Sequence, residues 1–113
     1  MKTDLLPVVE NVSCCSDLPT ALSSADAEAK AARFKALADP TRVQLLHLVA
    51  GAGRDEACVC DLTDTVKLSQ PTVSHHLRIL VDAGLLTRER RGTWAWYRVA
   101  DAGQRVLKAD LGF

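Results

Sequence analysis

The sequence predicts a mainly α fold of about five helices with a two-stranded β-hairpin near its C-terminal end. Three observations lead to this expectation. Apolar residues recur at helical spacing through residues 24–83, an arginine-rich stretch and an aromatic-rich stretch then flank an Arg-Gly pair, and a last apolar stretch follows. The chain has 113 residues, 48% of them hydrophobic, which is enough for one domain with its own core.

The first two helices are expected on either side of an Asp-Pro pair. Ser24 or Asp26 is a suitable N-cap for a first helix that ends near Leu37. Pro40 suits the first turn of a second helix, which a Gly-Ala-Gly segment ends. His47 lies among apolar residues of this helix, so we expect it to pack in the core rather than to bind a ligand.

A short third helix is expected from Cys58 to about Val66, and Ser69 then caps a fourth helix that ends near Gly84. The apolar residues of the fourth helix form one inward stripe, and its polar residues face away from that stripe. These polar residues are Gln70, Thr72, Ser74, His75 and Arg78.

The C-terminal part is expected to form a hairpin and one more helix. Residues 85–90 and 94–99 have the composition of strands, and the turn lies at Arg91-Gly92. Asp101 is a suitable N-cap for the last helix. The complete order of elements is that of a winged helix-turn-helix.

Such a fold binds DNA by laying the second helix of the motif in the major groove, with the hairpin on the backbone or in the minor groove. The formal net charge is zero, but residues 67–98 hold six basic residues against two acidic ones, which fits nucleic-acid contact through one face. The candidate DNA-binding residues are Ser69, Gln70, Thr72, Ser74, His75, Arg78, Arg88, Arg90 and Arg91.

All four cysteines lie in two tight pairs, Cys14-Cys15 and Cys58-Val59-Cys60. Residues 1–23 lack helical periodicity, so we expect a flexible arm that carries the first pair, followed by a winged-helix domain over residues 24–113. We see no signal peptide and no uncharged stretch of transmembrane length, and therefore expect a cytoplasmic protein without a membrane partner. Clustered cytoplasmic thiols more often bind metals or undergo redox chemistry than form structural disulfides.

The segments FKALADPTRVQLLHLV, CVCDLTDTVKLSQPTVSHHLRILVDAGLL and RRGTWAWYRV resemble the ArsR/SmtB family of metal-sensing repressors, over about residues 33–99. The resemblance implies a homodimer with the first and last helices at its interface. It also implies repression at an inverted repeat of double-stranded DNA in the ion-free state, and release when a metal ion binds.

The resemblance also bears on the site. The last helix has no His, so the family's zinc site on that helix is expected to be absent. Cys58 and Cys60 match the family's CVCDL motif, but Thr63 stands where the enterobacterial type of arsenic sensor has its third cysteine. The missing ligand must then come from the arm. The adjacent Cys14 and Cys15 depart from the spaced arm cysteines of the cadmium/lead branch and resemble those of some actinobacterial-type arsenic sensors.

Soft thiolates favour soft ions, and arsenite and antimonite prefer three of them in a pyramid. Cys14 and Cys15 with either Cys58 or Cys60 can supply this set. Our interpretation is a repressor that arsenite or antimonite releases from its operator. The alternative is a repressor that responds to cadmium, lead or zinc through all four cysteines.

Other classes fit less well. An enzyme is not expected, because the sequence has no CxxC at a helix start, no glycine-rich phosphate loop and no nucleophile–base set. A metal-buffering protein would leave the basic hairpin without a role. A redox switch, and a DNA-binding regulator whose cysteines are incidental, remain open.

Overall fold

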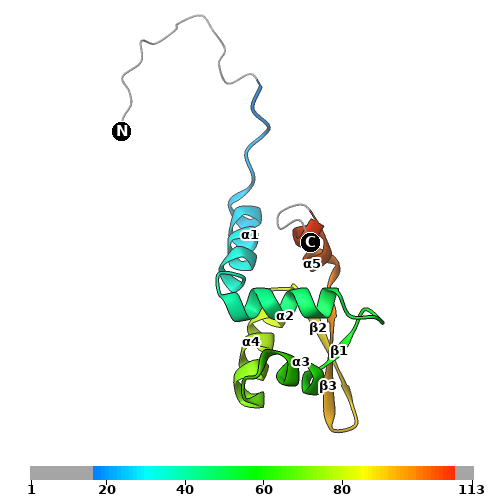
Figure 1. The fold of residues 1–113 in the computed structure, drawn as a ribbon. Helices are drawn as coiled ribbons and strands as arrows, with labels where there is room; N and C mark the ends of the chain where they lie inside the picture. The colour runs from blue at the N-terminus through cyan, green and yellow to red at the C-terminus, as the bar shows by residue number, and fades with distance from the viewer. Residues whose placement is uncertain (1–16, 109–113) are drawn as a thin grey trace, which may run out of the picture.

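The computed structural model describes residues 17–108 and contains, in its described part, five helices and three strands (Figure 1). In chain order these are α1 (Ser24–Ala36), α2 (Pro40–Ala50), β1 (Ala57–Cys58), α3 (Val59–Val66), α4 (Gln70–Asp82), β2 (Leu86–Arg91), β3 (Trp94–Val99) and α5 (Asp101–Val106). The predicted winged helix-turn-helix is therefore confirmed. Most of the predicted arm, including Cys14 and Cys15, lies outside the described residues.

Side chains cap the first two helices. The N-cap of α1 is Ser23 and not Ser24 or Asp26 as expected, and its side chain accepts a hydrogen bond of 3.1 Å from the backbone N–H of Asp26. Asp39 accepts one of 3.1 Å from the N–H of Arg42 and so caps α2, with proline as the first helical residue. The expectation for α5 was wrong, because Ala100 occupies the N-cap position and Asp101 is already helical.

The helix-turn-helix consists of α3 and α4. Gly84 follows α4 with a φ of +80°, a conformation that costs glycine little. Its N–H bonds the carbonyl of Val81, and the N–H of Leu85 bonds the carbonyl of Leu80. This pair of bonds satisfies the last carbonyls of α4 and turns the chain directly into the wing.

The wing is the antiparallel hairpin of β2 and β3, and Gly92, with a φ of +63°, allows the tight turn at its tip. Sequence reasoning did not anticipate β1, which pairs with β3 through Ala57 opposite Tyr97 and Cys58 opposite Trp96. A strand of two residues shows no alternation from which it could be predicted. Its consequence is that the Cys58 backbone is attached to the middle of the wing strand β3.

The core joins α2, α4 and the start of β2, and each fully buried leucine contributes about 1.5–3 kcal/mol. The inward stripe expected for α4 is confirmed at three positions. The expectation for His47 was wrong, because its side chain lies on the exposed face of α2. The side chains that are almost completely buried are Leu45, Leu46, Val49, Val73, Leu77, Leu80, Leu85 and Leu86.

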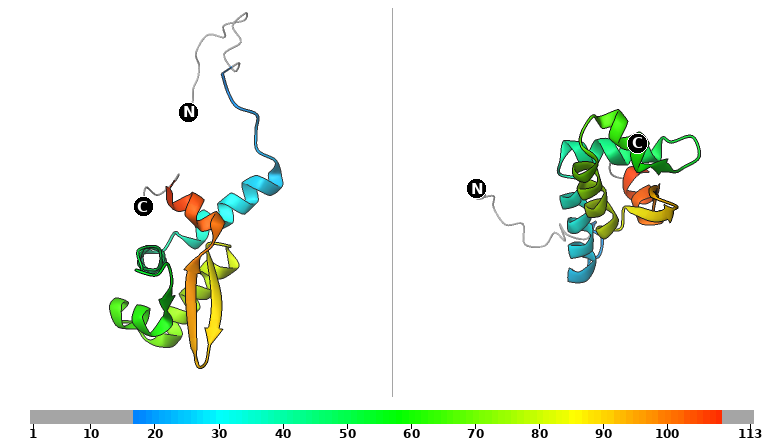
Figure 2. Two further views of the ribbon diagram at one scale, coloured as in Figure 1. Left: turned by 90° about the vertical axis from the view of Figure 1, so that its right-hand side faces the viewer. Right: turned by 90° about the horizontal axis from the view of Figure 1, so that it is seen from below.

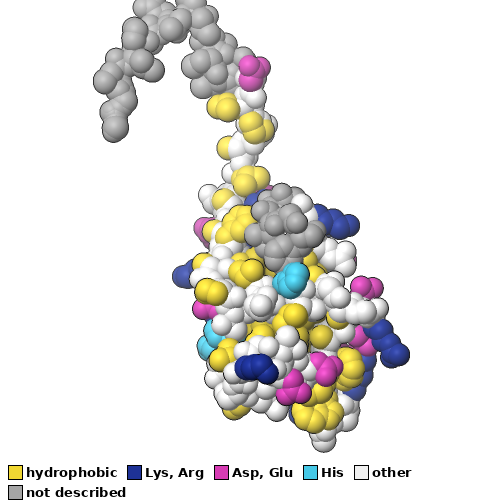
Figure 3. All heavy atoms as spheres, in the orientation of Figure 1, with side chains coloured by type: hydrophobic (Ala, Val, Ile, Leu, Met, Phe, Trp, Pro, Cys, Tyr) yellow, Lys and Arg dark blue, Asp and Glu magenta, His cyan; other side chains and the backbone are white. Residues whose placement is uncertain are grey.

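Helix α1 contributes little to this core, since Ala36 is its one buried residue. Phe34 of α1 is 46% exposed, and Leu22, which lies just before the helix, is 57% exposed. Figure 3 shows apolar side chains gathered over this part of the molecule. Helices α1 and α5 lie at the end of the domain opposite the tip of the wing (Figure 2). Among residues 17–108, no helix is long and apolar enough to cross a membrane.

Candidate DNA interface and thiol site

The polar face of α4 is open to solvent, as the sequence predicts. Gln70, Thr72, His75 and Arg78 are exposed, and Ser74 is half-buried. The predicted candidates Ser69 and Thr72 are joined to each other at the start of the helix. The Ser69 hydroxyl accepts a bond from the Thr72 N–H and donates one of 2.8 Å to the Thr72 hydroxyl. Both hydroxyls therefore help to define the first turn of α4.

A groove of about 450 Å³ separates α4 from the wing. Because side chains alternate along a strand, Arg88 and Arg90 share one face of β2. The structure thus brings five candidate DNA-binding residues to one groove, three of them arginines, as a phosphate backbone requires. The five are Gln70, Ser74, Arg78, Arg88 and Arg90.

The arginines of this groove are only weakly engaged within the protein. Arg78 lies 3.9 Å from Asp82 one turn later, and both side chains are more than two-thirds exposed, so this ion pair contributes little. Arg88 and Arg90 form no ion pair with any residue between 17 and 108. Their charges are available to an external anion.

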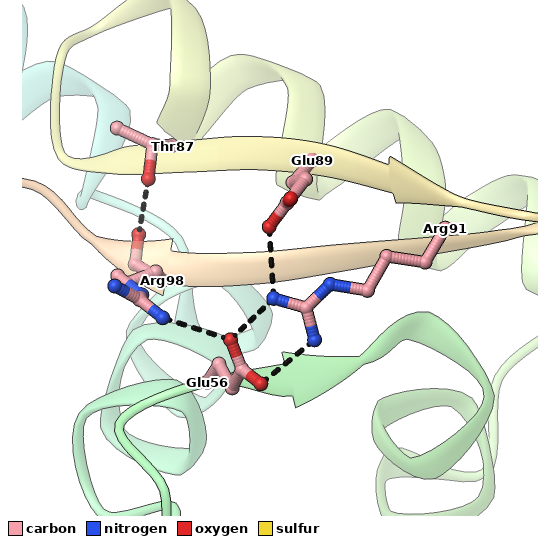
Figure 4. A network of polar contacts seen from close by, with 5 residues as sticks. All are labelled: Glu56, Thr87, Glu89, Arg91 and Arg98. Atoms are coloured by element: carbon pink, nitrogen blue, oxygen red, sulfur yellow. Dashed lines mark hydrogen bonds and ion pairs between the residues drawn. The ribbon is translucent and has the colours of Figure 1, made fainter.

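Arg91 differs from the other two wing arginines. It lies on the opposite face of β2, where its guanidinium donates two bonds of 2.8 Å to the Glu56 carboxylate and one of 2.8 Å to Glu89 (Figure 4). Its guanidinium carbon also lies 4.9 Å from the centre of the Trp96 ring. Arg98 donates a bond of 2.9 Å to the same Glu56 oxygen.

These contacts change the ionisation of the group at the centre. The hydrogen bonds from Arg91 and then Arg98 lower the pKa of Glu56 to about 2, and Glu56 in turn raises the pKa of Arg91. Sequence reasoning missed Glu56, because its two partners lie 35 and 42 residues further along the chain.

The two adjacent histidines of α4 have different surroundings. His75 is exposed, whereas His76 is mostly buried, and its Nδ1 lies 3.2 Å from Arg42. Arg42 also donates a hydrogen bond to the carbonyl of Ala36 at the end of α1. One histidine therefore faces outward, and the other packs against Arg42.

Cys58 and Cys60 lie together where β1 meets α3. Cys58 is 2% exposed, and its sulfur caps α3 by accepting a hydrogen bond of 3.4 Å from the Cys60 N–H. A hydrogen bond with the Cys58 thiol, and then burial, raises the pKa of the half-buried Cys60. The two thiols are close enough to serve one soft ion.

The rest of a thiol site is not found nearby. Residues 17–108 contain no group of three or more His, Cys, Asp or Glu side chains placed to hold a metal ion. The hydroxyl of Thr63 bonds the carbonyl of Val59 within α3. The predicted ligands Cys14 and Cys15 lie outside the described residues, so the structure gives two of the four candidate thiols.

Comparison with known proteins agrees with this geometry. Residues 39–88 match the family described as bacterial regulatory protein, arsR family. An arsenic resistance transcriptional regulator of Pseudomonas putida is 48% identical, over 68% of this chain and 70% of its own length. The chain belongs to the ArsR family. It is a DNA-binding transcriptional repressor and not an enzyme, as the sequence predicts.

Two further ArsR-type relatives bear on the effector. The chain is 44% identical to the arsenical resistance operon repressor of Bacillus subtilis, over 61% of this chain and 64% of the relative. It is also 39% identical to a cadmium resistance regulatory protein CadC homologue of Staphylococcus aureus, over 69% of this chain and 64% of the relative. The chain thus spans slightly less than two thirds of these two relatives.

Solved structures show the same fold. The antimony-specific transcriptional repressor AntR superimposes with a TM-score of 0.69 at 31% identity, over 92% of each chain. A homodimeric winged helix-turn-helix DNA-binding domain from Mycobacterium bovis gives 0.67 at 29% identity, over 74% of this chain and 76% of that one.

Proposed function

We propose that this ArsR-family protein is a metalloid-responsive repressor, which binds its operator in the ion-free state and leaves it when arsenite or antimonite binds cysteine thiolates. The observation that carries the proposal is the position of Cys58 and Cys60. They form a thiol pair on the segment that is paired with the wing strand β3 and packs against α4. An ion bound there would therefore act on a segment that contacts both candidate DNA-binding elements, the wing and α4.

The ligand set follows from the chemistry of the effector. Arsenite and antimonite take three thiolates, which Cys14 and Cys15 supply together with Cys58 or Cys60. The names of the Bacillus, Pseudomonas and AntR relatives support a metalloid. The second candidate is cadmium, lead or zinc bound by all four thiolates, and the Staphylococcus relative supports it.

The repressor acts as a homodimer on an inverted repeat of double-stranded DNA. Two observations support a second copy: the exposed Phe34 of α1 with the exposed Leu22 just before the helix, and the homodimeric domain from Mycobacterium bovis. A two-fold axis would place the two α4 helices about 34–36 Å apart, one turn of DNA. We further expect the protein to act in the cytoplasm, where its thiols stay reduced and no membrane partner is needed.

Release follows from competition between two states of the dimer. The bound ion draws the cysteine-bearing arm, of the same or the other subunit, onto the start of α3. The dimer then favours an arrangement of its α4 helices that no longer fits the operator. The size of the effect equals the free-energy difference that the ion creates between the two states.

Fluorescence anisotropy of a labelled inverted-repeat operator tests the proposal. The reduced protein is bound to the operator and titrated separately with arsenite, antimonite, cadmium, lead and zinc. We expect arsenite and antimonite to release the DNA at stoichiometric amounts, with little effect of the divalent ions. Release by cadmium or lead alone would favour the four-thiolate alternative, and release by none would contradict both.

The pH dependence of ion binding separates the two candidates in a second way. Arsenous acid exchanges its hydroxyl groups for protonated thiols and forms water, with no net change in protons. A divalent cation instead displaces one proton from each thiol that it binds, so its affinity falls as the pH falls. Because the pKa of Cys60 is raised, its thiol is protonated at neutral pH. Arsenite affinity should therefore change little between about pH 6 and pH 8.

A further inference from the structure

Glu56 connects all three strands of the sheet that contains the wing. It directly precedes β1, and its carboxylate receives two hydrogen bonds from Arg91 of β2 and one from Arg98 of β3 (Figure 4). The same carboxylate is two residues from Cys58 in the chain. The residue that contacts both strands of the hairpin is therefore close in sequence to the thiol pair.

This cluster differs from an ordinary surface ion pair. The Glu56 side chain is 13% exposed, whereas the carboxylate and guanidinium of a typical surface pair are both well solvated. The pairing with Arg91 is bidentate, which fixes direction as well as distance. Stacking of Arg91 on Trp96 adds a further restraint from β3.

We propose that Glu56 is a positioning residue for DNA binding, which holds the wing in its operator-binding orientation and joins it to the strand that carries Cys58. In this arrangement Arg91 serves as the partner of Glu56 inside the protein and not as a ligand of DNA phosphate. The part of the proposal that concerns the thiols rests on the proposed function, whereas the part that concerns the wing does not.

The orientation matters because of what lies on the other face of β2. Arg88 and Arg90 point into the groove beside α4, and they can contact the DNA backbone only while the hairpin keeps its angle to that helix. Contacts at Arg91 and Arg98 fix both strands of the hairpin from the opposite side. A shift of Cys58 on ion binding would move Glu56 with it and carry the hairpin away from this angle.

Glu56→Gln tests the wing, with Glu89→Gln as the matched control. Each variant removes one negative charge beside Arg91, but Glu89 is 66% exposed, and its one ion pair within residues 17–108 is with Arg91. Charge alone would make both variants bind operator DNA more tightly. We expect the operator affinity of Glu56→Gln to be lower than that of Glu89→Gln by a factor of about three or more. Equal affinity of the two variants would overturn the proposal.

The salt dependence of binding distinguishes positioning from a general loss of structure. Loss of the Arg88 and Arg90 contacts should make the slope of log K against log salt shallower in Glu56→Gln, by about one unit for each lost phosphate contact. Partial unfolding would lower the active fraction and leave this slope unchanged. An unchanged slope in folded Glu56→Gln would therefore count against the proposal.

Arg91→Lys tests the role of the arginine itself and does not depend on Glu56→Gln being stable. Lysine keeps the charge but cannot form the bidentate pair. If Arg91 positions the wing, Arg91→Lys weakens operator binding relative to the unsubstituted protein. Where Glu56→Gln also folds, the double variant should be little weaker than either single variant. Affinity close to that of the unsubstituted protein would show that Arg91 is an ordinary phosphate ligand and overturn the proposal.

Titration with arsenite in the same assay tests the link to the thiols. If arsenite releases the unsubstituted protein from DNA, we expect arsenite to lower the operator affinity of Glu56→Gln by a smaller factor. The amount of arsenite bound per protein should be the same in both. An equal factor would overturn the link. If no ion releases the unsubstituted protein, the proposed function fails, and the comparison of ion-free affinities still decides the role of Glu56 in the wing.

Discussion

At the scale of single residues, Cys58 combines three structural roles. It pairs with Trp96 through its backbone, caps α3 with its sulfur and lies beside the Cys60 thiol. A residue with this many attachments cannot move alone, because any shift of its sulfur also affects the first turn of α3 and the strand register. This property makes it a suitable origin for a conformational change.

Replacement of Cys58 by serine separates the ligand role from the capping role. A serine hydroxyl is a good N-cap, so Cys58→Ser should keep α3 and leave ion-free operator affinity within about twofold. Release by arsenite should be lost, because a hydroxyl is a poor ligand for a soft ion. The measurement is operator anisotropy with and without arsenite.

Cys60→Ser is the companion variant, since its position is half-buried and does not cap the helix. Release that persists in Cys58→Ser and is lost in Cys60→Ser would assign the third thiolate to Cys60. Persistence in both variants would contradict a site on this segment.

Residue-level prediction succeeded where the signal is local. The polar face of α4 could be predicted from helical spacing, and the thiol pair from its motif. Glu56 could not, because its role depends on β1 pairing with β3 and on arginines from two other strands. His47 was misjudged for a related reason, since apolar neighbours along the chain do not show which face of α2 is covered.

At the scale of elements, the close approach of α5 to the start of β2 fixes the end of the domain opposite the wing tip. A Cβ at Gly103 would lie 2.3 Å from the carbonyl oxygen of Leu85 and 3.1 Å from the Val99 side chain. The same carbonyl accepts a hydrogen bond from Ala100 at the start of α5. Glycine is required here by space and not by backbone conformation.

Gly103→Ala should therefore displace α5 and destabilise the domain, although alanine favours a helix by up to about 1 kcal/mol. We expect a net loss of roughly 1–3 kcal/mol in the free energy of unfolding. Thermal unfolding followed by circular dichroism would show this loss as a lower Tm. The control is Gly53→Ala, where an added Cβ would meet nothing within 4 Å. Equal Tm values for the two variants would contradict the packing described.

Element-level prediction was limited mainly by short segments. The order of helices and the hairpin could be predicted, because their periodicity extends over many residues. The strand β1 has two residues and no periodicity. The N-cap of α5 is Ala100, one residue before the predicted Asp101. These small differences matter, because β1 is the element that attaches the thiol pair to the wing.

At the scale of the whole molecule, the tip of the wing and helix α1 lie at opposite ends (Figures 1 and 2), and Cys58 lies opposite the middle of the wing strand β3. Such a layout allows a dimer to form at one end while both wings and both α4 helices meet DNA at the other. The sequence predicts this division of roles from its charge distribution and its resemblance to the family. The relative placement of two copies depends on contacts between chains, which no pattern within one chain reveals.

In the proposed mechanism, ion binding and operator binding oppose each other through this one domain, and coupling between two ligands is reciprocal. The most direct test is the arsenite affinity of the reduced protein, measured first free and then saturated with operator DNA. The account predicts that operator DNA weakens arsenite binding by the same factor as arsenite weakens operator binding, a factor that is typically about 5- to 150-fold. Arsenite affinity that is unchanged by operator DNA would contradict it.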